Sequence, residues 1–204
     1  MTRRTMAIFS AALVLAACSD DATMEPTGDR LTRAEASVIA NNVTANSDQT
    51  AAMPTASTVS SNLVASDPLD FTRELELNIV CPAGGNLQQK WTVTASIDAE
   101  AGNFSLDIVG FQKHLACAYV HEGLTITVDG DPDIDMEAHV ATEDHHPTEH
   151  TLEIDGAFKW TASDGRSGTC PISLDAVTDF GARRRTVEGT VCGHTISETT
   201  TWSL

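Results

Sequence analysis

Apolar and polar residues alternate with a period of two through most of the chain after residue 69. For example, Leu75, Leu77 and Ile79 are separated by Glu76 and Asn78. Because successive side chains of a β-strand point to opposite faces, this pattern predicts strands with one face in a core and one in water. Similar runs occur at 91–98, 104–108, 124–128, 134–140, 152–160, 170–174 and 185–202.

Turn sequences separate these runs at regular intervals, as at Gly84-Gly85, Gly102-Asn103 and Asp164-Gly165. Short turns of this kind join antiparallel neighbours, and no helical pattern lies between the runs to support a parallel sheet. We therefore predict an all-β domain over 69–204, an antiparallel meander of about eight or nine strands. Periodicity does not distinguish a barrel, a sandwich and an open curved sheet; we favour a sandwich or barrel because either would protect the sheet edges.

A different pattern precedes the β-domain. Residues 18–30 are polar and aperiodic, which predicts a flexible tether. Thr32 and Glu35 then form a capping box, with Leu31 in the staple position, so we predict a short helix over 31–44. Residues 45–68 are rich in Ser, Thr, Ala and Asn, and we interpret them as a flexible linker.

The first residues have the layout of a signal peptide. Arg3 and Arg4 precede an apolar run from Met6 to Ala17, which is too short to cross a bilayer, since a spanning helix needs about 20 residues. The sequence Leu15-Ala16-Ala17-Cys18 resembles the lipobox of bacterial lipoproteins. The resemblance covers only residues 1–18 and implies removal of 1–17, lipidation of Cys18 and attachment to the membrane through that lipid.

The residues after Cys18 bear on localisation. Ser19 follows the cysteine directly, and Asp20 comes one place later. By resemblance to enterobacterial sorting, where Asp directly after the cysteine retains a lipoprotein at the inner membrane, this order favours the outer membrane. We therefore expect a lipid-anchored protein of the bacterial cell envelope.

Four cysteines remain after the lipidated one, and an even number in an exported chain predicts two disulfides. Three pairings are possible. Hairpin neighbours favour Cys81 with Cys117 and Cys170 with Cys192. A zinc site is the alternative, but the four cysteines contain no Cys-x-x-Cys pair.

The formal charge of −17 argues against nucleic acid as a partner. Nucleic-acid binding needs clustered Lys and Arg, and the one basic run is Arg183-Arg184-Arg185, so we expect no nucleic-acid partner. Removal of 1–17 takes away two arginines and no acidic residue, which makes the mature chain more acidic still.

The densest polar cluster spans 143–150. Imidazole and carboxylate groups at this density can bind a divalent transition metal, which makes His145, His146, Glu149 and His150 a candidate weak metal site. Pro147 prevents His146 and His150 from sharing a helical face, and a polar hairpin loop explains the segment equally well. We expect no other cofactor.

No recognised nucleophile or cofactor motif accompanies these features, and we assign no catalytic residue. The leading hypothesis is a non-enzymatic envelope lipoprotein whose β-domain binds or supports another envelope protein. A β-barrel that binds a small ligand or a divalent metal is the second hypothesis. The third is a hydrolase with a site assembled from separate loops.

Overall fold

The computed structural model describes residues 26–52, 69–98, 100–130 and 133–203. The predicted signal peptide, Cys18 and most of the predicted linker lie outside these ranges. The helix is α1 (Arg33–Ala52), and the strands are β1 (Thr27–Gly28), β2 (Leu69–Val80), β3 (Asn86–Asp98), β4 (Asn103–Leu115), β5 (Cys117–His121), β6 (Leu124–Gly130), β7 (Ile134–Glu143), β8 (His146–Ala162), β9 (Ser167–Asp179), β10 (Arg184–Val191) and β11 (His194–Thr201).

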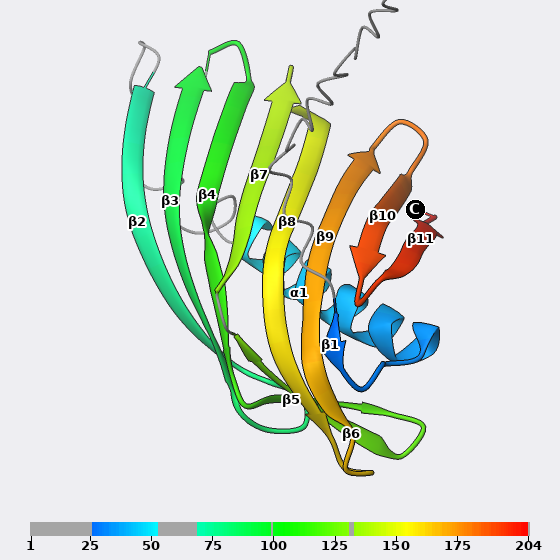
Figure 1. The fold of residues 1–204 in the computed structure, drawn as a ribbon. Coiled ribbons are helices and arrows are strands. Elements are labelled where there is room, and N and C mark those ends of the chain that lie inside the picture. Colours follow the sequence, from blue (N-terminus) through cyan, green and yellow to red (C-terminus); the bar gives the residue numbers. More distant parts are fainter. Residues whose placement is uncertain (1–25, 53–68, 99, 131–132, 204) are drawn as a thin grey trace, which may run out of the picture.

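The eleven strands of the described residues form one antiparallel sheet with the order β11-β10-β9-β8-β7-β4-β3-β2. The predicted all-β meander is confirmed. One insertion interrupts it: β5 and β6 form a hairpin between β4 and β7, and β6 pairs with the last residues of β8. The sheet does not close, and its long strands curve together over α1 (Figure 1), so the favoured barrel or sandwich gives way to an open curved sheet.

The alternation of polar and apolar residues gives the sheet two different faces. Along β3, exposed and buried residues alternate without a break, with Trp91 and Val93 buried and Lys90 and Thr92 exposed. The inner face packs toward α1 in one apolar cluster, which also contains Phe158. We use "outer face" for the opposite, solvent-exposed side of the sheet.

Gly110 in β4 lies where neighbouring backbones approach closely. A Cβ atom on this residue would overlap the carbonyl oxygen of Lys90 and lie 2.9 Å from the Cα atom of Trp91. Glycine removes that obstacle at a position where a strand otherwise prefers a larger side chain.

Helix α1 begins as predicted. The Thr32 backbone N–H donates to Glu35 Oε2 at 2.7 Å, and the Glu35 N–H donates to Thr32 Oγ1 at 3.3 Å. The helix then continues to Ala52, beyond the predicted end at 44. Ile39 and Val43 are fully buried, and their packing stabilises the first part of the helix despite a sequence with low intrinsic helix preference.

The end of the predicted tether, residues 26–30, is attached to the sheet. Thr27 pairs with Thr169 and Gly28 with Gly168, and the Ser167 N–H donates to Asp29 Oδ2 at 3.0 Å. These bonds depend on a distant part of the chain, so local composition does not reveal them. With α1 in the core as well, residues 53–68 connect two parts of one folded body.

Both disulfides have the favoured pairing. Cys81 is bonded to Cys117 and Cys170 to Cys192, with Cα–Cα distances of 5.4 Å and 4.5 Å. Within the described ranges, no helix has the length and apolar character needed to cross a membrane.

Candidate functional site

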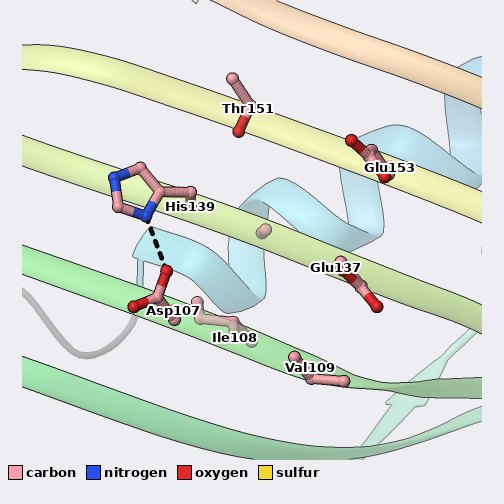
Figure 2. Close-up of a pocket in the computed structure, with 8 residues that line it drawn as sticks. Asp107, Ile108, Val109, Glu137, His139, Thr151 and Glu153 are labelled. Atoms are coloured by element: carbon pink, nitrogen blue, oxygen red, sulfur yellow. Dashed lines mark hydrogen bonds and ion pairs between the residues drawn. The ribbon is translucent and has the colours of Figure 1, made fainter.

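A shallow depression of about 160 Å³ lies on the outer face, where β4, β7 and β8 run side by side. Figure 2 shows the polar side chains that line it, which come from the central parts of three adjacent strands, β4, β7 and β8. They are Asp107, Glu137, His139, Thr151 and Glu153.

His139 and Asp107 form the one direct polar contact at this depression that Figure 2 marks. The two residues lie opposite each other on β7 and β4, with His139 Nδ1 2.7 Å from Asp107 Oδ1. An ionised carboxylate only accepts, so Nδ1 carries the proton and donates it. The other ring nitrogen, Nε2, has no hydrogen-bond partner among the described residues.

Acidic residues dominate the rest of this face because the strand register aligns them. Glu137 lies opposite Glu153, Glu153 opposite Asp175, and Asp175 opposite Glu188. These four exposed residues, on β7, β8, β9 and β10, form a row that we name the acidic row. Asp135 and Asp155 oppose each other two residues away.

This arrangement is unfavourable for folding. Like charges directly opposite each other on neighbouring strands destabilise a sheet, by a few tenths of a kcal/mol per pair when solvent screens them. Among the described residues, no member of the acidic row has a cationic group within ion-pair distance. Two lysines of neighbouring strands pair with other carboxylates, Lys90 with Glu74 and Glu76 and Lys113 with Asp133.

The size of the depression limits what can bind there. Sites that enclose a small organic molecule usually have volumes of about 300 Å³ or more. A depression of about 160 Å³ that is open to solvent suits a smaller group, such as the end of a lysine or arginine side chain. The surrounding carboxylates favour a cationic group over an anionic one.

The depression does not have the geometry of a hydrolase site. Thr151 lies opposite His139, which suggests a hydroxyl–imidazole–carboxylate set with Asp107. However, the backbone groups of these central strands pair with β4, β7, β8 and β9, so they do not form an oxyanion hole. No hydrogen bond connects Thr151 to His139 within the described part of the chain.

The predicted metal-binding residues do not converge. His145 and His146 are exposed around the β7–β8 turn, and the His145 ring lies against Gly102. His150 is half-buried on the inner face with its Nδ1 3.4 Å from Thr178 Oγ1, and burial lowers its pKa. Glu149 is exposed, and in the described ranges no three His, Cys, Asp or Glu side chains come together to hold a metal.

The basic run at 183–185 is divided between two environments. Arg183 lies in the β9–β10 turn and Arg184 at the start of β10, both exposed, whereas Arg185 lies on the inner face, where burial lowers its pKa. The three arginines therefore do not form one anion-binding surface.

Sequence reasoning did not identify the residues that gather on the outer face. Asp107, Glu137 and Glu153 each occupy a polar position in an alternating run, which is ordinary for a strand. Only the register, with β4 beside β7 rather than β5, brings them together. Acids do alternate within single strands, as at Asp135 and Glu137, but this local pattern does not reveal which strands are neighbours.

Comparison with known proteins gives no further guide to the site. No protein-family model matches the chain, and no curated protein or solved structure is significantly similar to it.

Proposed function

We propose that this protein is a non-enzymatic lipoprotein of the bacterial cell envelope, anchored through Cys18, whose outer sheet face binds a cationic protein surface. The lipobox-like sequence and the two disulfides support an envelope location. The acidic row is the observation that carries the binding function.

Repulsion within the acidic row costs folding free energy that no ion pair among the described residues offsets. Glu137, Glu153, Asp175 and Glu188 stand in direct register, and repulsion between them lowers the stability of the folded state. Proteins that keep such a local conflict usually do so at a functional surface. A partner with lysines or arginines at matching positions would turn the repulsion into attraction and would associate faster through electrostatic steering.

The depression adds a preferred position on this face. A lysine or arginine of the partner that enters between Asp107, Glu137 and Glu153 would contact three carboxylates on three strands. The proposed partner is therefore a protein with a basic surface, and a membrane is a less suitable occupant of this face because anionic lipid headgroups would be repelled.

Photo-cross-linking in intact cells tests this proposal. Val109 and Val177 are exposed apolar residues on the outer face, 53% and 50% accessible, so a photoreactive residue there changes no charge. We expect a defined cross-linked product from either position. The substitutions E137Q, E153Q, D175N and E188Q together should reduce its yield at least tenfold.

The matched control is E100Q, E122Q, E143Q and D144N, which removes the same number of charges from exposed positions in turns and strand ends away from the row. This control should retain the product. Equal loss in both variants would show that only net charge matters, and absence of any product at both positions would contradict the proposal.

A further inference from the structure

The strand β2 forms one margin of the sheet (Figure 1). It pairs with β3 through an unbroken register, from Leu69 opposite Ile97 to Val80 opposite Asn86. In the described ranges, no other strand pairs with β2, and no backbone bond reaches it from outside β3. Because every second residue of such a strand directs its N–H and C=O groups away from the sheet, this edge presents a row of donors and acceptors.

The edge lacks most of the features that protect sheet margins. Natural edge strands are usually short or carry a proline, a lysine or a bulge, which prevents the addition of a further strand. β2 has 12 residues, about twice the common strand length, and contains neither proline nor lysine. The strand at the opposite margin, β11, has eight residues. β2 is therefore the better template for strand addition.

The inner-face side chains of β2 are less buried than those of its neighbour. Leu75 and Ile79 are half-buried, whereas Trp91 and Leu87, which lie opposite them on β3, are fully buried. A strand beside β2 would cover these apolar groups at the margin of the core. The occupant of this edge therefore needs apolar side chains at alternate positions.

The remaining side chains of β2 specify charge. Asp70, Glu74 and Glu76 are exposed on the outer face, where Lys90 of β3 contacts Glu74 at 3.9 Å and Glu76 at 3.7 Å. One lysine against three carboxylates leaves this side of the edge negative, and lysine or arginine on an incoming strand would be attracted to it. Arg73 is exposed on the inner side, so the position opposite it suits an acidic residue.

We infer that the edge of β2 binds an extended segment of a partner protein, in which basic and apolar residues alternate, as an added antiparallel strand. Backbone hydrogen bonds would supply affinity, and the two rows of side chains would supply selectivity. β2 lies three strands from β7, where the acidic row begins, so binding at this edge is separate from binding at the row.

Two other arrangements fit these observations less well. A second copy of the chain could pair its own β2 here, but the two antiparallel registers with the longest overlap, inner face beside inner face, place Glu74 opposite Glu74 or Glu76 of that copy. Addition to β11 would gain no such charge selection, because Thr195, Ser197 and Thr199 on its outer face are uncharged.

Binding of a synthetic peptide to the full-length protein in detergent tests this inference. The probe Val-Thr-Val-Lys-Val-Lys-Glu-Thr-Val-Lys places lysines opposite Glu76, Glu74 and Asp70 and glutamate opposite Arg73. We expect saturable binding by fluorescence anisotropy, with hydrogen exchange slowed at least threefold in β2 and unchanged in β11. Absence of saturable binding, or protection only outside β2, would overturn the proposal.

Two N-methylated forms of the peptide distinguish strand addition from adsorption to an acidic surface. An added strand uses the N–H groups of alternate residues only. Methylation of one alternate set should therefore abolish binding, and methylation of the other set should preserve it. Equal affinities of the two forms, whether retained or lost, would contradict strand addition.

Charge-matched variants test whether the carboxylates of β2 select the peptide. E74Q with E76Q should weaken binding about fivefold, because two exposed ion pairs are lost. E122Q with E143Q, which removes two exposed charges away from β2, should leave the affinity within about twofold. Equal weakening by both pairs would show a response to net charge alone and would overturn the assignment to this edge.

Discussion

Arg166 holds the carboxylate of Glu35 with two hydrogen bonds, from Nη2 to Oε1 at 2.6 Å and from Nη1 to Oε2 at 3.1 Å. Glu35 is 6% exposed at the start of α1, and Arg166 lies in the β8–β9 turn. A further bond from Arg166 Nη1 reaches the carbonyl oxygen of Arg30 at 3.2 Å. One side chain therefore attaches both the N-terminal segment and the helix to the sheet.

Loss of this guanidinium should destabilise the protein strongly. The substitution R166A leaves the Glu35 carboxylate buried without its cationic partner, which costs about 3 kcal/mol of unfolding free energy. The exposed Arg33 on the same helix is the matched control, and R33A should change stability by less than about 0.5 kcal/mol. Urea unfolding without reductant measures both, and equal stabilities for the two variants would show that the pair does not hold the helix.

Because Arg166 and Glu35 form an ion pair, we expect the protein to lose stability in acid. The hydrogen bonds from Arg166 lower the pKa of Glu35 from 4.5 to about 2. Because the folded pKa is depressed, the stabilisation is complete above pH 4.5 and is lost as the pH falls through 2, by about 3 kcal/mol in total. Unfolding free energy measured from pH 6 to 2 should show this decline in the wild type and a shallower one in E35Q; parallel curves would disprove the assignment.

Protonation of His114 should lower the stability of the protein in a higher pH range. It is 1% exposed, and burial lowers its pKa from 6.5 to about 4. The unfolded chain binds this proton more readily, so stability falls by about 3 kcal/mol as the pH decreases from 6.5 to 4. H114L should remove this part of the pH dependence, whereas H146Q, at an exposed histidine, should keep it. A wild-type stability that stays constant from pH 6.5 to 5 would contradict the prediction.

Gly110 should not accept a side chain. A Cβ atom there overlaps the Lys90 carbonyl, so G110A must displace β3 or β4, and we expect a loss of about 3 kcal/mol or more. At Gly181 the nearest atom to an added Cβ is Asp179 Oδ1 at 3.5 Å, and G181A should be tolerated. Thermal unfolding of the two variants gives the comparison, and similar midpoints would show that β4 can adjust.

The sequence contains the local elements of this fold more clearly than its long-range contacts. Alternation from Leu75 onward predicts the strands, and the Thr32–Glu35 capping box marks the start of α1, because both signals act within a few residues. The contacts of Arg166 with Glu35 and of Thr27 with Thr169 join parts of the chain far apart in sequence. No local rule specifies such pairs.

The candidate site depends on register for the same reason. Asp107 and His139 come together because β4 pairs with β7 while the β5–β6 hairpin is inserted between them in sequence. The candidate metal site at 143–150 could be recognised in the sequence because its residues are close together along the chain. In a strand, adjacent side chains point to opposite faces, and Glu149 and His150 accordingly differ in exposure.

Mass analysis of the mature protein isolated from its native membrane tests the central claim, that this chain is a lipid-anchored envelope protein, most directly. The proposal predicts an N-terminal peptide that begins at Cys18 and carries covalently bound acyl groups, together with disulfide-linked peptides containing Cys81–Cys117 and Cys170–Cys192. Detection of Met1 on an unacylated chain would contradict both the anchor and the envelope function.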